Sequence, residues 1–152
     1  MHDDRREERC ENSESLSIFS KNAFISNDDK LKELMGEFHD LDWDVMCFSE
    51  TRAKDDLIDL DGGHRLLTCL LGDKFAGVGL LVHRKWRQKI LRYHRVSGRV
   101  CAVDIKMTTF VCRIISVYIP CGGHDWQEVE DVYNDLHILL DEATRQGMKV
   151  IL

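Results

Sequence analysis

Strand-like segments follow one another through the middle of this 152-residue chain, with only short links between them. Each is apolar or alternates apolar with polar residues, and together they cover residues 65–71, 77–83, 89–94, 99–107 and 110–118. The clearest alternation lies in residues 101–106, where Cys101, Val103 and Ile105 alternate with Ala102, Asp104 and Lys106. Short links favour antiparallel neighbours. The middle of the chain therefore predicts mostly antiparallel sheets.

Helical patterns lie on both sides of this region. Residues 16–22 predict a first strand, and the polar run from Ser26 to Asp29 predicts the start of a helix. Apolar residues then recur at helical spacing, at Leu31, Leu34, Met35, Phe38 and Leu41. A second and longer helix is predicted over residues 125–146, with a strand over 148–152 after it. The chain thus predicts a mixed α/β fold in which helices lie outside the sheets.

Two segments carry no core-forming pattern. Residues 1–13 are almost wholly polar and predict a disordered N-terminal tail, which leaves residues 14–152 as the domain. Residues 53–63 are largely polar, and Asp61, Gly62 and Gly63 predict a turn.

The net charge of the chain does not indicate a nucleic-acid partner. The formal net charge is −6 and the sequence pI is about 5.6. One segment, residues 83–99, is strongly basic, with Arg84, Lys85, Arg87, Lys89, Arg92, Arg95 and Arg99. Two interpretations stay open for it: a solvated pair of edge strands, or a contact surface for a phosphate backbone.

The six cysteines favour a reduced, intracellular protein. None forms a C-x-x-C pair, so no structural zinc site is predicted, and Cys47 and Cys69 lie in apolar runs typical of buried thiols. The polar N-terminus is unlike a signal peptide, and no apolar run approaches the roughly 18 residues of a membrane span. We therefore expect a location in the nucleus or cytoplasm and no membrane partner.

A carboxylate follows the most apolar short run. Residues 45–48 are Val-Met-Cys-Phe, a pattern typical of a strand buried on both faces, and Glu50 comes two residues later. A carboxylate at a strand end has a fixed direction, which suits an oxygen ligand of a hard divalent cation. The alternative is a surface carboxylate that merely ends the strand.

Three segments in this order resemble the endonuclease/exonuclease/phosphatase family. They are Ser-Glu-Thr-Arg at the end of residues 43–52, Gly-Val-Gly-Leu-Leu-Val at 77–82 and Ile-Ile-Ser-Val-Tyr-Ile-Pro at 114–120. Within that family the sequence is similar to apurinic-type endonuclease domains of non-LTR retrotransposons and to the craniofacial-development-protein-2-like group. The resemblance implies a four-layer α/β/β/α sandwich, of which this chain is the N-terminal portion. It also implies Mg²⁺-dependent hydrolysis of DNA phosphodiester bonds, with DNA as the partner.

The resemblance assigns roles to three residues. Glu50 matches the metal-binding glutamate. Asn22 matches an asparagine at the end of the first strand that helps to position the metal and the phosphate, with Asn27 as a rival that suits a helix cap better. Tyr118 matches a position at which a phenol can donate to a phosphate oxygen, although a tyrosine that only packs at the strand end is the alternative.

Other polar and aromatic residues are interpreted structurally. Arg52 could contact a phosphate, but a solvated arginine is the simpler interpretation. The histidines lack the Ser-Asp-His context of the family, so all of those considered are assigned structural roles: His64, His83, His94, His124 and His137. Trp126 and Tyr133 are expected in the helix core rather than in a platform for stacked bases.

Further motifs of the family are absent from the sequence: Gly-Asp-Phe-Asn, a later metal-binding aspartate and the Ser-Asp-His ending. The first hypothesis is therefore an endonuclease fragment that is inactive alone. The second is a non-enzymatic remnant that binds protein or nucleic acid, and the third is a reading frame that continues beyond Leu152. Half a sandwich would also leave a sheet uncovered, which predicts self-association.

Overall fold

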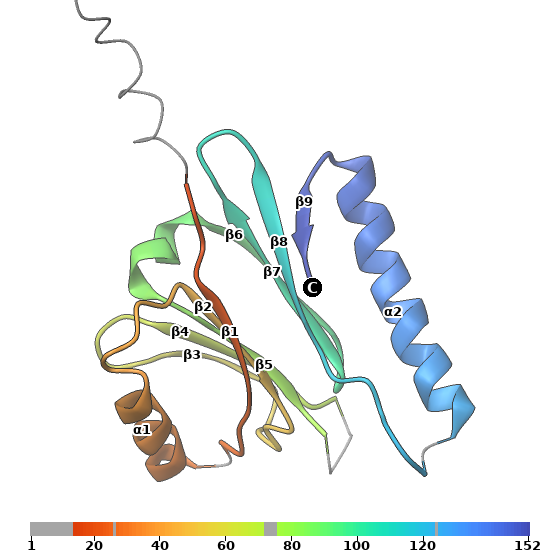
Figure 1. Ribbon diagram of the computed structural model, residues 1–152, viewed down its shortest axis with the longest axis horizontal. Coiled ribbons are helices and arrows are strands. Elements are labelled where there is room, and N and C mark those ends of the chain that lie inside the picture. The colour runs from red at the N-terminus through yellow and green to blue at the C-terminus, as the bar shows by residue number, and fades with distance from the viewer. Residues whose placement is uncertain (1–13, 26, 72–75, 124) are drawn as a thin grey trace, which may run out of the picture.

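The computed structural model describes residues 14–25, 27–71, 76–123 and 125–152 (Figure 1). The strands are β1 (Ile18–Asn22), β2 (Val45–Ser49), β3 (Asp56–Asp59), β4 (Arg65–Cys69), β5 (Val78–Val82), β6 (Ile90–Ser97), β7 (Val100–Lys106), β8 (Val111–Val117) and β9 (Lys149–Ile151). The helices are α1 (Asp28–Glu37), the 3₁₀-helix η1 (Arg84–Lys89) and α2 (Trp126–Arg145). The predicted N-terminal tail, residues 1–13, lies outside the described residues.

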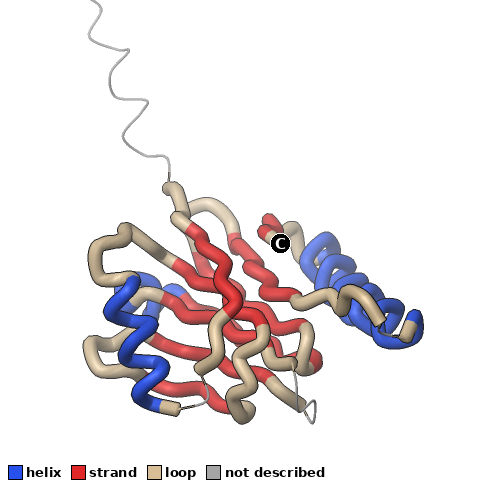
Figure 2. The backbone as a smooth tube through the Cα atoms, turned by 60° about the horizontal axis from the view of Figure 1, so that its bottom comes forward, coloured by secondary structure: helices blue, strands red, loops and turns tan. Residues whose placement is uncertain are grey.

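The described strands form two sheets that pack face to face. The first has the order β1-β2-β5-β4-β3 and the second has the order β6-β7-β8-β9. Neighbouring strands are antiparallel except for β1 with β2 and β8 with β9, and each of these parallel pairs is connected through a helix. Helix α1 covers the outer face of the first sheet and α2 that of the second (Figures 1 and 2). The predicted α/β class, with mostly antiparallel sheets and outer helices in four layers, is confirmed.

Strand β2 is apolar throughout because both of its faces are covered. Val45 and Cys47 face the second sheet and contribute to the core between the sheets. Met46 and Phe48 face α1, where the ring of Phe48 stacks on that of Phe38 with the centroids 6.2 Å apart. The strand thereby enters the middle of the sandwich and leaves it at Ser49.

Two segments differ from the prediction. Residues 53–63 contain β3, which pairs with β4 at the edge of the first sheet and packs only Ile58 against the core, so its sequence has no apolar alternation. The predicted turn is present, with φ of 90° at Gly62 and 91° at Gly63.

The basic segment forms η1 and the single edge strand β6 rather than two edge strands. Four of its side chains have carboxylate partners: Lys85 with Asp44, Arg87 with Asp59, Arg92 with Glu142 and Arg99 with Glu128.

Helix α2 buries a narrower stripe than predicted. Its buried side chains are Val132, Leu136, Leu139 and Ala143. Trp126 is 85% exposed and Tyr133 is 57% exposed, so their assignment to the helix core is wrong. Trp126 is the first residue of the helix, and Tyr133 lies about 100° around the axis from Val132, away from the sheet.

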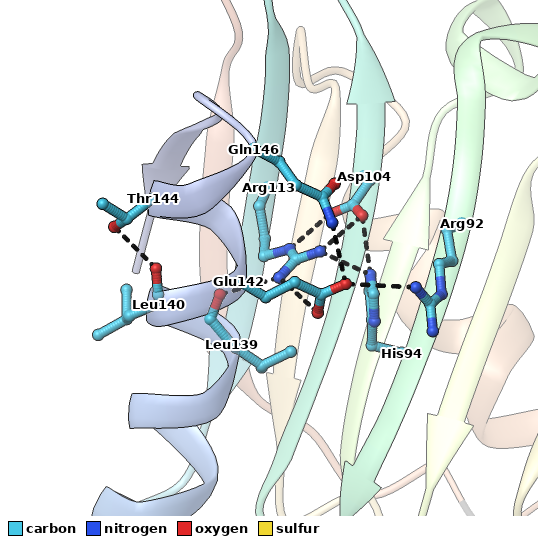
Figure 3. Close-up of polar contacts among 9 residues, drawn as sticks. All are labelled: Arg92, His94, Asp104, Arg113, Leu139, Leu140, Glu142, Thr144 and Gln146. Atoms are coloured by element: carbon cyan, nitrogen blue, oxygen red, sulfur yellow. Dashed lines mark hydrogen bonds and ion pairs between the residues drawn. The ribbon is translucent and has the colours of Figure 1, made fainter.

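A buried charged network joins the second sheet to α2 (Figure 3). The guanidinium of Arg113 is fully buried and donates to both carboxylate oxygens of Asp104, at 2.7 and 2.9 Å. It also donates to the carbonyl oxygen of Leu139 at 2.8 Å and pairs with Glu142 at 3.3 Å. His94 lies 2.8 Å from Asp104, so its role in the fold is structural, as predicted.

The cysteines of the described residues are free, as expected for reduced thiols. Cys69 is buried and Cys47 is half-buried, and burial raises the pKa of each thiol to about 11. Both thiols are therefore protonated at neutral pH and act as small apolar side chains.

Candidate functional site

Strands β1, β2 and β8 all finish at one edge of the sandwich, and a residue predicted for the site lies at or just after the end of each strand. Strands β1 and β2 are parallel, so Asn22 and Glu50 lie at the same edge of the first sheet. Strand β8 packs against β2, where the hydroxyl of Ser116 donates to the carbonyl oxygen of Phe48 at 3.2 Å. This packing brings Tyr118, the residue after β8, to the same edge.

The carboxylate of Glu50 is bonded from two sides. The hydroxyl of Tyr118 donates to Oε1 at 2.7 Å, and the side-chain amide of Asn22 donates to Oε2 at 2.9 Å. Each carboxylate oxygen has two lone pairs, so one on each remains for a further partner. The two hydrogen bonds fix the orientation of the carboxylate and leave it partly open to solvent.

The backbone that carries Glu50 is held in an unusual conformation. Glu50 and Arg52 have φ of 55° and 49°, in the left-handed region that costs an L-residue about 1 kcal/mol. The amides of Thr51 and Arg52 donate to the carbonyl oxygens of Gly77 and Ala76, at 3.1 and 3.0 Å. Gly77 has φ of 109°, and a Cβ there would lie 2.5 Å from the hydroxyl oxygen of Thr51. The lack of a side chain at Gly77, in the Ala-Gly-Val-Gly segment, thus leaves space for the turn that orients Glu50.

The hydrogen bonds keep Glu50 ionised. Donation from Tyr118 and then from Asn22 lowers the pKa of Glu50, slight burial opposes this, and the charge of Arg52 lowers it further. The same bond to Glu50 raises the pKa of Tyr118. At neutral pH the pair is therefore a carboxylate with a protonated phenol.

The hydroxyl proton of Tyr118 is directed at Glu50 rather than at the open edge. A phenol has one proton to donate, so Tyr118 can donate to a phosphate oxygen only if its hydrogen bond to Glu50 is broken. The guanidinium carbon of Arg99 lies 5.3 Å from the Tyr118 ring centroid, and the amide of Tyr118 donates to the carbonyl oxygen of Arg99 at 2.8 Å. In the sequence Arg99 belongs to the basic segment, and no pattern there predicts its contact with Tyr118.

The rival residues lie elsewhere or have other partners. The side chain of Asn27 caps α1 by accepting from the amide of Lys30 at 2.9 Å, as the sequence predicts for it. Arg52 is exposed, and its guanidinium carbon lies 5.5 Å from the ring centroid of Phe24.

The histidines make structural contacts where they are described. The rings of His64 and His83 lie 5.0 and 4.9 Å from that of Trp43. His137 is exposed and pairs with Asp141 on α2. His124 lies outside the described residues.

The donor set suits a weakly held hard cation. Within the described ranges, no group of three or more histidine, cysteine, aspartate or glutamate side chains is placed to hold a metal ion. Glu50 supplies one ionised carboxylate, and each of its oxygens keeps a lone pair beyond the bond from Tyr118 or Asn22. Mg²⁺ often takes one or two carboxylates and completes its shell with water and substrate oxygens. Glu50 therefore offers one carboxylate of the kind that Mg²⁺ takes, and water or substrate oxygens would have to supply the rest of the shell.

Solved structures share the fold at low sequence identity. A 3' phosphatase, NExo, from Neisseria, bound to product DNA hairpin, is 18% identical with a TM-score of 0.59; the match covers 86% of this chain and 54% of that one. The AP endonuclease LMAP from Leishmania major is 12% identical with a TM-score of 0.51, over 80% of this chain and 47% of that one. No protein-family model matches the chain, and no curated protein matches it significantly.

At these identities the likenesses show the fold alone: this chain has the mixed α/β fold, with two sheets and outer helices, of endonuclease/exonuclease/phosphatase-type structures. The chain spans about half the length of the solved structures that it matches. None of the helices in the described part of the chain is long and apolar enough to cross a membrane.

Proposed function

We propose that this chain carries one part of the active site of a Mg²⁺-dependent phosphodiesterase that acts on DNA, related to the endonucleases of non-LTR retrotransposons. The observation that carries the proposal is the convergence of Asn22, Glu50 and Tyr118 from three strand ends. The similar fold of a DNA-bound phosphatase and of an AP endonuclease supports it.

In this proposal Glu50 holds Mg²⁺ at the edge of the sandwich. The bound ion would polarise a phosphate oxygen and lower the pKa of a water molecule. Asn22 and Tyr118 hold the carboxylate in one orientation, so that little rotamer freedom is lost when the ion binds. The guanidinium of Arg99 lies next to Tyr118 and pairs with the carboxylate of Glu128 at 3.9 Å, so its charge at this edge is partly balanced.

We further propose that the chain alone does not hydrolyse DNA. Water attack on a phosphodiester needs a group that removes a proton, and the described residues place a single carboxylate and no histidine at the site. A second carboxylate or a His–Asp pair from another polypeptide segment would complete it.

Metal binding tests the proposed role of Glu50. Titration of the purified chain with Mn²⁺, followed by paramagnetic broadening of amide signals, should broaden residues around Asn22 and Glu50 first. The Glu50→Gln variant should lose this selective broadening, whereas the exposed Glu130→Gln on α2 should retain it. Equal broadening in wild type and Glu50→Gln would contradict the metal site.

A plasmid-nicking assay tests inactivity separately. The chain with Mg²⁺ should leave supercoiled plasmid intact. Robust nicking that depends on Mg²⁺ and disappears in Glu50→Ala would overturn the proposal that the chain is inactive alone.

A binding module without catalysis is the second candidate, and the single carboxylate of the site favours it. Nucleic acid as its ligand predicts that the logarithm of the binding constant falls linearly with the logarithm of salt concentration. The ion pairs of Lys85, Arg87 and Arg92 reduce the free positive charge of the basic segment. Absence of a salt slope, together with capture of a protein ligand, would favour a protein-binding remnant.

A further inference from the structure

The segment after Asn22 carries an exposed aromatic side chain, Phe24, between two residues whose backbone amides are hydrogen-bonded. The amides of Ala23 and Ile25 donate to the carbonyl oxygens of Ser49 and Thr51, both at 3.1 Å, so the segment continues alongside the turn that follows β2. Ala23 and Ile25 are each 6% exposed, whereas Phe24 between them is 47% exposed. The backbone therefore fixes Phe24 outward, two residues beyond the end of β1.

Arg52 lies against this ring. Its guanidinium carbon is 5.5 Å from the Phe24 ring centroid, and its backbone amide is bonded to Ala76. Phe24 follows Asn22 by two residues, and Arg52 follows Glu50 by two residues. Since Asn22 and Glu50 are hydrogen-bonded to each other, the aromatic–guanidinium pair flanks the proposed phosphate site directly.

A shallow hollow of about 260 Å³ opens beside the ring, between the end of β1 and α1. Phe24 and Asn22 form part of its wall. The charged side chains of the wall are two lysine–glutamate pairs, Lys21 with Glu37 and Lys30 with Glu33. Because each lysine has a carboxylate partner, the hollow has little net charge, which favours an uncharged planar group over a phosphate.

We propose that Phe24 and this hollow bind the base of an unpaired nucleotide next to the phosphate that Mg²⁺ would bind at Glu50, and that Arg52 contacts the adjoining backbone phosphate. The proposal rests on the proposed function for the position of that phosphate. A paired base in a duplex is already stacked on both of its faces, so a base must be unpaired to stack on Phe24. The ligand class is therefore single-stranded nucleic acid or a frayed strand end.

Fluorescence anisotropy with a labelled oligothymidylate of about ten nucleotides tests the platform, with Mg²⁺ present because the proposed position of the phosphate depends on the ion. Phe24→Ala should weaken binding about tenfold, and Phe24→Tyr should bind as wild type does because it keeps the ring. Arg52→Ala should reduce the slope of the salt dependence by about one, whereas Phe24→Ala should leave that slope unchanged. Tyr133→Ala, which removes a similarly exposed ring from α2, is the matched control and should have no effect.

The same variants are titrated with a GC-rich, blunt-ended duplex whose strands have the same length as the oligothymidylate. Phe24→Ala should leave duplex binding unchanged. The inference is overturned if wild type does not bind the single strand, if Phe24→Ala binds it as tightly as wild type, or if the variant loses duplex binding equally. Thermal melts of all variants that match wild type exclude misfolding as the cause.

Failure of the proposed metal site gives a different pattern. If Mn²⁺ does not selectively broaden the signals around Glu50 in the wild-type chain, the proposed function is contradicted. Binding of the single strand that still depends on the Phe24 ring would then leave the base platform in place.

Discussion

The hydroxyl of Tyr118 is the main cause of the low pKa of Glu50, and Asn22 is the second. A carboxylate with two donors is both ionised and fixed in direction, which a metal ligand requires. The pair also explains why a tyrosine stands at the end of β8: its ring packs against Arg99 while its hydroxyl reaches across to the first sheet.

Tyr118→Phe should therefore raise the pKa of Glu50 toward its ordinary value. The phenylalanine ring keeps the packing against Arg99 and removes only the donor. Carbon-detected NMR titration of the Glu50 carboxyl group measures the change. Asn22→Ala should raise the pKa as well, by less than Tyr118→Phe does. An unchanged Glu50 pKa in Tyr118→Phe would mean that the hydrogen bond does not control ionisation.

Gly77 holds the turn that carries Glu50, and its replacement should destabilise the chain. In Gly77→Ala the new Cβ would meet the hydroxyl of Thr51 and the backbone nitrogen of Arg52, at 2.5 and 2.9 Å, and φ would stay at 109°. We expect a loss of about 3 kcal/mol in unfolding free energy, since strain and overpacking add. Gly36→Ala in α1, with nothing within 4 Å of its Cβ, should instead stabilise by about 0.5 kcal/mol. Urea unfolding of both variants gives the comparison, and equal effects would contradict the tight packing at Gly77.

At the scale of elements, α2 is attached to the second sheet by both apolar and charged contacts. Its stripe of Leu136 and Leu139 covers Ala102 and Ile115, and Arg113 reaches from β8 to a carbonyl oxygen of the helix (Figure 3). A buried arginine is tolerated here because its donors are directed at Asp104, Glu142 and the helix backbone, which compensates its desolvation.

This network predicts acid sensitivity. Burial alone would raise the pKa of Asp104, but hydrogen bonds from Arg113 and His94 outweigh it and hold the pKa at about 2. The folded-state pKa is below the ordinary value of 3.8, so the stabilisation is complete above about pH 4 and is lost as the pH falls toward about 2. The loss amounts to about 2 kcal/mol for this one group.

The Asp104→Asn variant isolates the contribution of this group. At neutral pH it should unfold about 3 kcal/mol more easily than wild type, because the Arg113 charge loses its main partner. The difference should shrink as the pH falls toward about 2, where wild-type Asp104 is also protonated. Denaturant unfolding at several pH values measures it, and a difference that does not depend on pH would contradict this account.

Periodic apolar patterns made most of the elements predictable, and the exceptions have physical causes. The stripe of α2 repeats with the helical period, and the run Val45–Phe48 is continuously apolar as expected for a strand covered on both faces, so both were placed correctly. Strand β3 buries little more than Ile58, and η1 follows no apolar period, so neither had a signal. Trp126 fits the helical period but lies in the first turn, where its side chain is exposed.

Glu50 and Tyr118 could be named as candidates because each follows a strand in a segment that resembles a family motif, and Asn22 because it ends the predicted first strand. Their mutual contacts could not be predicted, since Asn22 and Glu50 meet only when β1 pairs with β2, and Tyr118 reaches Glu50 only when the two sheets pack. The pairing of Phe24 with Arg52 and the burial of Arg113 are also consequences of tertiary packing. Single sequences carry no periodic signal for such contacts between distant segments.

For the whole molecule, the open side of the sandwich lies between β1 and β9. Each of these strands is the last of its sheet and leaves backbone donors and acceptors unpaired along its outer edge. A hollow of about 380 Å³ lies between them, with apolar residues of both sheets in its wall. Phe19, Ile151 and Leu152 are exposed at this side, at 39%, 39% and 66%. Two unpaired edges that flank an apolar hollow favour association with another chain.

We therefore expect the purified chain to self-associate through this side. Sedimentation velocity over a wide range of concentrations should show a weight-average mass that rises with concentration. Ile151→Lys places a charge in the hollow and should shift the distribution toward monomer. Leu91→Lys on β6, the opposite edge of the second sheet, changes the net charge equally and removes a similarly exposed apolar residue, so it should associate as wild type does. A monodisperse wild-type monomer, or equal effects of the two lysines, would show that the β1–β9 side does not direct association.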